Sequence, residues 1–341
     1  MAEVTVVGGG LAGSEAAWQL AQRGHDVVLV EMRPVRSTPA HTTDRLGELV
    51  CTNSFKSEDP TNAHGLLKLE MRALGSVLLD AADRARVPAG AALAVDRDIF
   101  ASTLTERIAA HPRIRIERAE VTAIPEGPAV IASGPLTSDA LSAAIRDFLG
   151  DDALAFFDSI APIVAAESID YSIAFFASRW GRGEGEDYLN CPMDEAQYLE
   201  FVAALRSADV YPGHDWERVP YFEGCLPVEV LAARGDDTLR FGPMKPIGLR
   251  DPRTGRRPWA VVQLRREDRD GRMWNLVGFQ TRLRTGEQRR VFRMIPGLAG
   301  AEFLRYGSIH RNSYLDFPAR LAPYGAPAGR PDLIFAGQLT G

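Results

Sequence analysis

The hydrophobic pattern is clearest at the start of the chain. Residues 4–7 form an apolar run, and the glycine-rich stretch 8–13 follows it directly. Apolar and small residues then recur at helical spacing over 14–23, before a second apolar run at 27–30 that ends in Glu31. This order predicts a buried strand, a tight glycine turn, a helix and a second strand, which together form the first unit of a parallel α/β sheet.

The same alternation continues to about residue 150. Apolar residues recur at helical spacing over 64–86, which predicts one long helix, and Asp98 is expected to cap the next helix. A further helix is expected to start at Ser138 or Asp139. We therefore expect residues 1–150 to form a Rossmann-like α/β domain. Between the helices the pattern predicts short strands at 113–118, 120–124 and 129–132.

The pattern changes near residue 154. Prolines and aromatic residues become frequent, and short strand-like runs replace the regular alternation, with one clear helix over 194–206. We expect an inserted α+β domain over 151–330. Residues 331–341 again form an apolar run that leads into a glycine turn, so this segment is expected to return to the first domain. Because such a turn normally leads into a helix, the C-terminal part of that domain is expected to be missing.

The composition is typical of a soluble globular protein. The chain has 341 residues, of which 45% are hydrophobic and 25% charged, and no apolar run approaches the roughly 18 residues of a membrane span. The N-terminus has no basic region of the kind that opens a secretory signal. Three cysteines without a C-x-x-C pair suit a reducing compartment and argue against a zinc site. We expect a cytoplasmic protein with no membrane association and no metal.

One segment departs from the net charge of −6 that the whole chain carries. Residues 250–293 contain thirteen arginines, no lysine and five acidic residues. Two interpretations stay open. The segment is either a solvated surface rich in arginine or a basic face for a polyanion, because arginine pairs with phosphate through two parallel hydrogen bonds.

The glycine turn itself carries chemistry. Gly8, Gly10 and Gly13 fit the pattern G-x-G-x-x-G, in which the first glycine permits a tight turn, the second lets the backbone approach a pyrophosphate and the third lets the helix pack on the strand. Glu31 ends the second strand, where a carboxylate can accept hydrogen bonds from ribose hydroxyls. The unit predicts dinucleotide binding, with NAD and FAD both allowed. The small-residue turn at Gly134 is expected to pass close to the same ligand.

Several short sequence blocks, taken together, indicate a resemblance to one protein family. With the glycine turn and Glu31, the chain resembles the folate- and FAD-dependent tRNA (uracil-5-)-methyltransferase family, TrmFO. The blocks occur in order from Gly8 to Gly341. They are ELVCTNSF at 48–55, ASGPLT at 132–137, NCPM at 190–193, FEGCLP at 222–227, FGPMKP at 241–246, YGSIHRN at 306–312 and FAGQ at 335–338.

The resemblance implies a reaction and its cofactors. The dinucleotide is implied to be FAD, the carbon donor 5,10-methylenetetrahydrofolate and the reductant NADPH or NADH. The donor carries its carbon two electrons short of a methyl group, and a reduced flavin can supply those electrons. The substrate is implied to be tRNA, bound through its T-arm, with 5-methyluridine in the T-loop as product. No obligate protein partner is implied.

The resemblance also implies roles for particular residues. Cys225 is implied to be the nucleophile at uracil C6 and Cys51 to assist it, although a free cysteine is more often a small buried apolar residue. Cys191 keeps that structural interpretation. His310 lies either against the flavin and the folate or in a structural role, and Asn312 is a second substrate candidate in its block. The implied cofactor-binding residues are Gly8, Gly9, Gly10, Leu11, Ala12, Gly13, Glu31, Gly134, Gly337 and Gln338.

Three other functions stay open. The related MnmG (GidA) family, which modifies wobble uridines, shares the glycine turn and a late glycine-rich segment, but its pattern lacks the FEGCLP block at 222–227. A generic NAD(P)H-dependent FAD oxidoreductase fits the glycine turn and gives no reason for the arginine-rich segment. A non-catalytic FAD-containing RNA-binding protein keeps the fold and does not need Cys225.

Overall fold

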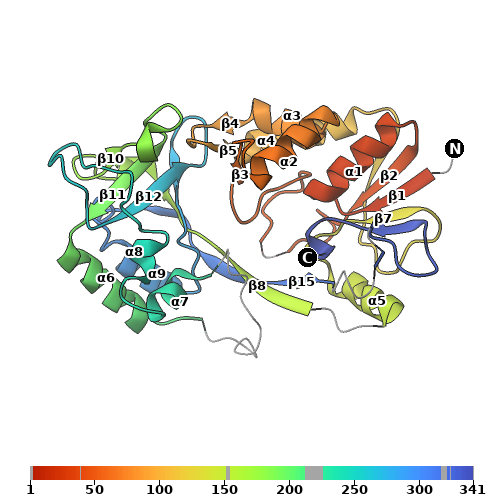
Figure 1. Cartoon of the computed structure of the whole chain (residues 1–341). Coiled ribbons are helices and arrows are strands. Elements are labelled where there is room, and N and C mark those ends of the chain that lie inside the picture. Colours follow the sequence, from red (N-terminus) through yellow and green to blue (C-terminus); the bar gives the residue numbers. More distant parts are fainter. Residues whose placement is uncertain are drawn as a thin grey trace.

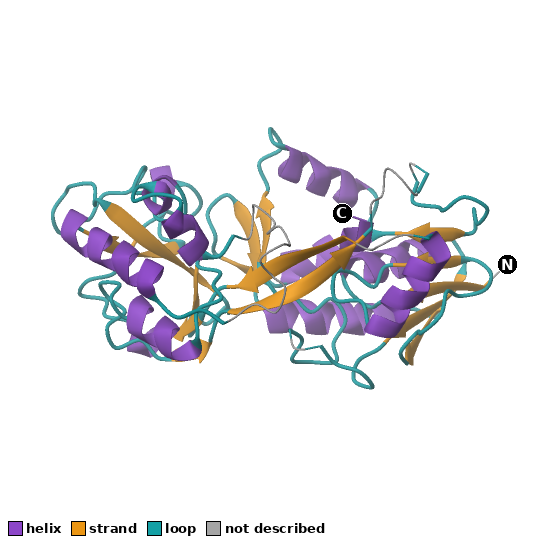
Figure 2. Cartoon of the chain, turned by 90° about the horizontal axis from the view of Figure 1, so that it is seen from below, coloured by secondary structure: helices purple, strands orange, loops and turns teal. Residues whose placement is uncertain are grey.

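In the computed structural model the chain folds into two lobes, which Figure 1 shows side by side. The first lobe contains the N-terminal elements and the last strand, and the second contains elements between residues 163 and 305. The paired strands β8 (Leu154–Ile160) and β15 (Ser308–Tyr314) run between the lobes (Figures 1 and 2). The structure describes residues 3–38, 40–150, 154–211, 226–315, 321–322 and 324–340, without the side chains of 154–159 and 309–313.

The first lobe is built on a five-stranded parallel sheet with the strand order β16-β7-β1-β2-β6. Successive side chains of a strand point to opposite faces, so β1 contributes Val6 to one apolar core and Val7 to another. Helices α1, α3 and α4 cover the face of Val6, and α5 covers the face of Val7. The elements are β1 (Glu3–Val7), α1 (Leu11–Gln22), β2 (Asp26–Glu31), α2 (Ala63–Ala73), α3 (Val77–Arg84), α4 (Arg97–Ala109), β6 (Ile114–Arg118), β7 (Ala129–Ile131), α5 (Asp139–Leu149) and β16 (Leu333–Phe335).

The predicted strand–turn–helix–strand unit is confirmed as β1, α1 and β2. The late apolar run also forms a strand, β16, which pairs with β7 at the edge of the same sheet. A short 3-10 helix, Gly337–Thr340, follows it. Segments from the two ends of the chain therefore lie in one sheet, and Figure 1 shows them together in the first lobe.

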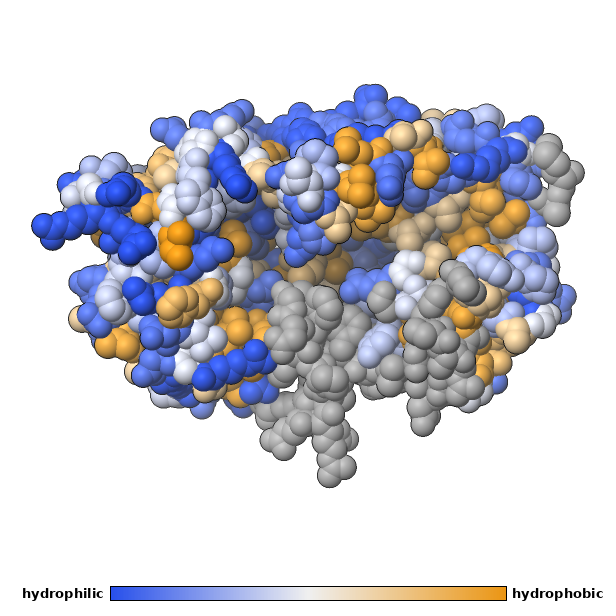
Figure 3. All heavy atoms as spheres, in the orientation of Figure 1, coloured by the Kyte–Doolittle hydropathy of each residue, from blue (hydrophilic) through white to orange (hydrophobic). Residues whose placement is uncertain are grey.

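The single helix predicted over 64–86 is wrong, because the structure has two helices there, α2 and α3. Between them Gly75 adopts a φ of 73°, and the Ser76 hydroxyl caps α3 by accepting a hydrogen bond from the Leu79 N–H. The break changes which apolar residues are buried. Helix α3 packs into the core, whereas the side of α2 that carries its leucines faces solvent. Figure 3 shows an apolar area over this part of the first lobe. The exposed leucines are Leu66, Leu67, Leu69 and Leu74.

Two smaller expectations also change. The cap of α4 is Asp96, whose carboxylate accepts hydrogen bonds from the N–H groups of Asp98 and Ile99, so Asp98 lies inside the first turn. No strand forms over 120–124, although the strands predicted on either side of that segment are present as β6 and β7. The helix predicted from Ser138 is confirmed as α5, with the Ser138 hydroxyl as its cap.

A three-stranded sheet lies at the boundary of the two lobes. It has the order β3-β5-β4, and both of its strand pairs are antiparallel. Figure 1 places it between the helices of the first lobe and the strands of the second. Its first strand begins three residues after Cys51. The sheet therefore fixes the position of the chain just after Cys51. The strands are β3 (Ser54–Ser57), β4 (Arg86–Val87) and β5 (Ala92–Val95).

The second lobe is built on a six-stranded antiparallel sheet with the order β10-β11-β12-β13-β9-β14. The helix predicted over 194–206 is confirmed as α6, which Asp194 caps through a reciprocal pair of hydrogen bonds with Gln197. The elements are β9 (Ile163–Ala165), β10 (Phe175–Phe176), β11 (Tyr188–Met193), α6 (Glu195–Ser207), α7 (Val228–Ala233), α8 (Thr238–Phe241), β12 (Ala260–Arg266), β13 (Met273–Leu276), α9 (Thr285–Phe292) and β14 (Phe303–Arg305), with 3-10 turns at Ala166–Ser168 and Arg179–Gly181.

The two faces of this sheet differ in chemistry. Along β12, Val262 and Leu264 belong to the apolar core of the second lobe, and the alternate positions Gln263 and Arg265 point to the opposite face. That polar face is buried as well, since Gln263 is 8% and Arg265 7% exposed. Residues of the first lobe, Asn53 among them, contact it. The polar face of the second sheet is therefore the inner surface between the lobes.

Removing a buried ring tests the packing of the apolar core in the second lobe. Phe279 is fully buried, and its ring centre lies 6.2 Å from that of Phe201 and 5.8 Å from that of Phe292. Because the neighbouring rings collapse only partly into the space left by Phe279→Ala, we expect the free energy of unfolding to fall by about 3–5 kcal/mol. In the matched control Phe241→Ala the ring is 74% exposed, and we expect a change within about 0.5 kcal/mol. Denaturant unfolding measures both, and equal losses would contradict the assigned core.

Candidate active site

The glycine turn is shaped to receive a phosphate-bearing ligand. Gly8 has a φ of 102°, and a Cβ atom there would lie 2.6 Å from the carbonyl oxygen of Ala132. A Cβ atom at Gly13 would overlap the carbonyl oxygen of Gly8, so only glycine lets α1 pack this closely on β1. At Gly10 a Cβ atom would meet nothing within 4 Å. No side chain caps α1 at this end, so open space lies before the N–H groups of its first turn.

Glu31 lies beside this turn and is 4% exposed. Its Oε2 accepts a hydrogen bond from the Gly9 N–H at 2.7 Å, and its Oε1 accepts one from Arg33 Nε at 2.8 Å. Burial raises the pKa of this carboxyl, but the hydrogen bonds and charge of Arg33 and the Gly9 N–H outweigh burial and hold the pKa below its ordinary value. Glu31 is therefore ionised at neutral pH, and Oε2 keeps a lone pair for a ribose hydroxyl.

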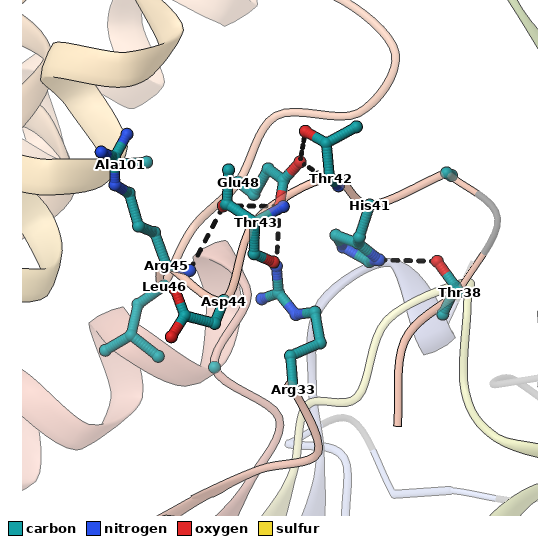
Figure 4. Close-up of polar contacts among 12 residues, drawn as sticks. Arg33, Thr38, His41, Thr42, Thr43, Asp44, Arg45, Leu46, Glu48 and Ala101 are labelled. Atoms are coloured by element: carbon teal, nitrogen blue, oxygen red, sulfur yellow. Dashed lines mark hydrogen bonds and ion pairs between the residues drawn. The ribbon is translucent and has the colours of Figure 1, made fainter. Parts of the chain in front are cut away.

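Arg33 connects Glu31 to a second carboxylate, Glu48. The Arg33 Nη1 donates to Glu48 at 2.9 Å, and Figure 4 shows Glu48 between Arg33 and the pair Thr42 and Thr43. Both threonines donate their backbone N–H and their hydroxyl to the carboxylate. Although burial raises the pKa of Glu48, these hydrogen bonds lower it below the ordinary value. The loop that ends at Glu48 is thus fastened to the end of β2.

The late glycine turn lies against the first one. A Cβ atom at Gly337 would lie 2.6 Å from the Cβ of Ala12, so the short helix that contains Gln338 touches the first turn of α1. Gly134 follows β7 with a φ of 71°, and its neighbour Ser133 lines the same crevice as Gly10 and Glu31. The structure therefore brings together the residues predicted to bind a dinucleotide. Their contact with the ligand stays a prediction.

A second feature is a cavity of about 330 Å³ between the lobes, which we call the inter-lobe cavity. Cys51 and Lys56 line it from the first lobe, and Arg265 and Asn275 line it from β12 and β13. Leu226 lines it too. The predicted nucleophile, at the preceding position 225, lies outside the described residues.

Arg97 holds the segment that carries Cys51 against both lobes. From the start of α4 its guanidinium donates to the carbonyl oxygens of Leu49 and Cys51. The same guanidinium forms an ion pair with Glu267 of the second lobe, with Nε 2.7 Å from the carboxylate, and Glu267 is 2% exposed. A buried, charge-assisted contact of this kind fixes a backbone position more firmly than an exposed one. The Cys51 backbone is therefore placed by contacts that need both lobes.

Asn53 makes a second connection between the lobes and is fully buried. Its Nδ2 donates to the carbonyl oxygens of Val95 in the first lobe, at 3.0 Å, and of Arg266 in the second, at 2.9 Å. Its Oδ1 accepts a hydrogen bond from Arg265 Nε at 2.8 Å. Arg265 also donates to the hydroxyl of Thr52 at 3.0 Å. Both residues that follow Cys51 are thus bound to Arg265.

Arg265 and Asn275 are the site residues that the sequence did not single out. The only signal was the alternation of polar and apolar residues in the strand around Arg265, which in an antiparallel sheet usually indicates a face open to water. Here the first lobe covers that face. Burial lowers the pKa of the Arg265 guanidinium, which reflects how little water reaches it.

The arginine-rich segment 250–293 is not one continuous basic face. Arg265 is buried, and the Arg266 guanidinium lies 5.6 Å from the ring centre of Trp274. Four others form ion pairs with Asp251, Asp268, Glu229 and Glu287. Exposed arginines with no carboxylate within 4 Å among the described residues lie in the loop before β12, in the turn between β12 and β13, and around α9; they are Arg250, Arg256, Arg257, Arg269, Arg284, Arg289 and Arg293.

The remaining predicted residues fall into two groups. Cys191 is fully buried in β11, where burial raises the pKa of its thiol to about 12, as suits a structural role. His310 and Asn312 lie in β15, and their side chains are outside the described part. Within the ranges that the structure describes, no three His, Cys, Asp or Glu residues are grouped to hold a metal ion, and no helix is long and apolar enough to cross a membrane.

The sequence of this chain is similar to those of a known protein family. The family model described as glucose inhibited division protein A matches residues 3–341. The methylenetetrahydrofolate–tRNA-(uracil-5-)-methyltransferase TrmFO of Anaeromyxobacter sp. (strain Fw109-5) is 60% identical over 341 residues, which cover 99% of this chain and 75% of the relative. The chain belongs to the TrmFO family. The TrmFO of Geobacter sulfurreducens is 59% identical over 339 residues, which cover 99% of this chain and 78% of the relative.

Solved structures confirm the fold that the TrmFO resemblance implied. Aquifex aeolicus GidA in its form II crystal has a TM-score of 0.73 and 17% sequence identity, over 99% of this chain and 60% of that chain. The form I crystal gives a TM-score of 0.72 and 18% identity, over 99% of this chain and 62% of that chain. The chain described here therefore spans about 60% of the length of the GidA chains and shares their α/β fold.

The contribution of Glu48 to the stability of the fold is expected to depend on pH. The pKa of Glu48 in the folded chain lies below its ordinary 4.5, so the ionised carboxylate stabilises the fold above about pH 4.5, and this stabilisation is lost as the pH falls through the folded pKa. We expect Glu48→Gln to lower the free energy of unfolding by about 1–3 kcal/mol at pH 7 and by much less at pH 3.5. Urea unfolding at the two pH values measures this, with the exposed Glu195→Gln as control. An equal loss at both pH values would contradict the assignment.

Proposed function

We propose that this chain methylates a tRNA uridine at C5, with 5,10-methylenetetrahydrofolate as carbon donor and FAD as the redox cofactor. The observation behind the proposal is the 56–60% identity, over at least 99% of the chain, to relatives named for that activity. The site geometry supports it, because a dinucleotide-shaped turn and a cysteine-lined cavity are linked within one fold.

The first lobe fits FAD. The open space before Gly10 and the free N–H groups of α1 suit the pyrophosphate, and the Oε2 of Glu31 suits a ribose hydroxyl. The late turn at Gly337 and Gln338 then forms a neighbouring wall. We assign cofactor binding to Gly8, Gly9, Gly10, Leu11, Ala12, Gly13, Glu31, Gly134, Gly337 and Gln338. When bound, the reduced flavin supplies the two electrons that turn the transferred carbon into a methyl group, and NADPH or NADH would restore it.

Two cysteines are assigned to the uracil ring. C5 of uracil is a weak nucleophile until a thiolate adds to C6, which forms an S–C6 bond and places the electron pair of the C5=C6 bond on C5 and O4. C5 then bonds to the donor carbon, the C5 proton passes to a base, and the bonds from that carbon to the folate nitrogens break, so that tetrahydrofolate leaves. Once the carbon has received the two electrons that complete the methyl group, the S–C6 bond breaks and returns the thiolate. We assign the addition to Cys225 and the proton removal to Cys51. His310 and Asn312 are proposed as further substrate residues.

We infer that the tRNA is bound through its T-arm. A uridine inside a folded loop must leave its stack before its ring enters a cavity between two lobes. The exposed arginines around α9 and before β12 offer contacts to the phosphates of such a loop. We further infer that the enzyme acts in the cytoplasm and without an obligate protein partner.

Covalent trapping tests this function. A T-arm stem-loop with 5-fluorouridine at the target position has no C5 proton to lose, so its enzyme adduct persists after the carbon transfer. Incubated with the donor, FAD and NADPH, the wild-type chain is expected to give a slowly migrating complex on a denaturing gel, and Cys225→Ala is expected to give none. Cys51→Ala should still trap the RNA, because it removes only the base.

The third thiol supplies the control for the trapping experiment. Cys191 lies in the apolar core of the second lobe, so the Cys191→Ala variant should trap the RNA like the wild type. Equal trapping by the wild type and Cys225→Ala would overturn the assignment of the nucleophile. Absence of the complex with the wild type would overturn the proposed function.

A further inference from the structure

Two buried polar side chains lie next to each other on the floor of the inter-lobe cavity. Arg265 on β12 and Asn275 on β13 are directly paired in the antiparallel sheet, so their side chains stand on the same face. They are 7% and 4% exposed, and both line the cavity that Cys51 lines from the opposite lobe. Their neighbours along the strands, Leu264 and Leu276, point into the apolar core behind them.

Much of the hydrogen-bonding capacity of these two side chains is unused. No hydrogen bond joins the side-chain amide of Asn275 to any residue that the structure describes. A guanidinium has five N–H donors, and that of Arg265 gives one to Asn53 and one to Thr52. No carboxylate of a described residue lies within 4 Å of it. Buried polar groups are nearly always paired in native proteins, so the Asn275 amide and the remaining N–H donors of Arg265, which face one cavity, indicate a ligand there.

We propose that Arg265 and Asn275 bind the target uracil by its imide edge, the side of the ring that carries O2, N3–H and O4. The proposal rests on the function proposed above. An asparagine amide matches this edge because its oxygen accepts from N3–H while its nitrogen donates to a neighbouring carbonyl. The guanidinium donates to O4. The apolar side chains of Leu231 and Val277 also line the cavity and offer apolar contacts to the ring.

This arrangement has a chemical consequence for the addition step. When a thiolate bonds to C6, the electron pair of the C5=C6 bond moves toward O4, which gains negative charge. A fixed guanidinium beside O4 stabilises that charge without giving up a proton, and it does so most strongly where water is excluded. The ring is thus held by the same group that lowers the barrier to its activation.

The same arrangement selects uracil over cytosine. At the position of O4, cytosine carries an amino group, which donates hydrogen bonds, and a guanidinium can only donate. A cytidine in the cavity would place two donors against each other. The second lobe therefore contributes base selectivity as well as shape.

Equilibrium binding separates base recognition from the rest of the tRNA contact. We would measure the affinity of the full chain for a T-arm stem-loop with uridine, cytidine or an abasic site at the target position. We expect Asn275→Ala to lower the preference for uridine over the abasic RNA by about five- to tenfold. Arg265→Gln, which introduces an acceptor, is expected to lower the preference for uridine over cytidine by a similar factor.

The abasic RNA and a neighbouring residue supply the controls. Affinity for the abasic RNA should be unchanged in Asn275→Ala, which also shows that this variant has folded. Arg265→Gln also loses the hydrogen bonds to Asn53 and Thr52, so its affinities for the uridine and cytidine RNAs are each compared with its own affinity for the abasic RNA. Arg266→Gln alters the adjacent side chain, which lies over Trp274, and should leave all three affinities unchanged.

Other results would overturn the proposal. Equal weakening of all three RNAs would show that Arg265 and Asn275 do not read the base. The pterin ring of the folate has a similar N–H and C=O edge, and a raised KM for methylenetetrahydrofolate with unchanged RNA preference would assign the cavity to the donor. Either result leaves the trapping of 5-fluorouridine RNA intact, so failure of this proposal is distinguishable from failure of the proposed function.

Discussion

The three hydrogen bonds of Asn53 are the contact on which the arrangement of the two lobes depends. One buried amide donates to the backbone of β5 in the first lobe and to the backbone of β12 in the second, and it accepts from Arg265. Loss of such a side chain leaves buried donors and acceptors unpaired, which costs about 1–3 kcal/mol for each group. Because Cys51 lies two residues earlier, the joint between the lobes and the position of the thiol are set by the same contact.

A chain of charged contacts links this joint to the glycine turn. Gly9 donates to Glu31, Arg33 bridges Glu31 and Glu48, and Glu48 leads directly into the segment that Arg97 holds. The groups are partly or fully buried, so water does little to weaken them. A continuous series of contacts therefore joins the glycine turn to the segment that carries Cys51.

The local structure around the glycine turn could be predicted from the sequence. The strand, glycines, helix and acid of the first unit act through neighbours in the chain, and the structure places them as expected. The break between α2 and α3 was missed because helical spacing continues through Gly75, and only packing reveals that the leucines of α2 remain exposed.

The inter-lobe site was not predictable for a related reason. Arg265 meets Asn53 across 212 positions of sequence, and nothing in a single strand shows that its polar face will be covered. The arginine count alone suggested a surface, whereas the structure divides those side chains among ion pairs, the lobe boundary and solvent. Long-range burial, rather than composition, decides what each arginine does.

The most direct test of the account is a crystal structure of the complex trapped with 5-fluorouridine T-arm RNA. We expect the uracil ring inside the inter-lobe cavity, with a cysteine sulfur bonded to C6, O4 beside the Arg265 guanidinium and N3–H on the Asn275 amide oxygen. A ring bound outside that cavity, or one whose imide edge faces solvent, would contradict it.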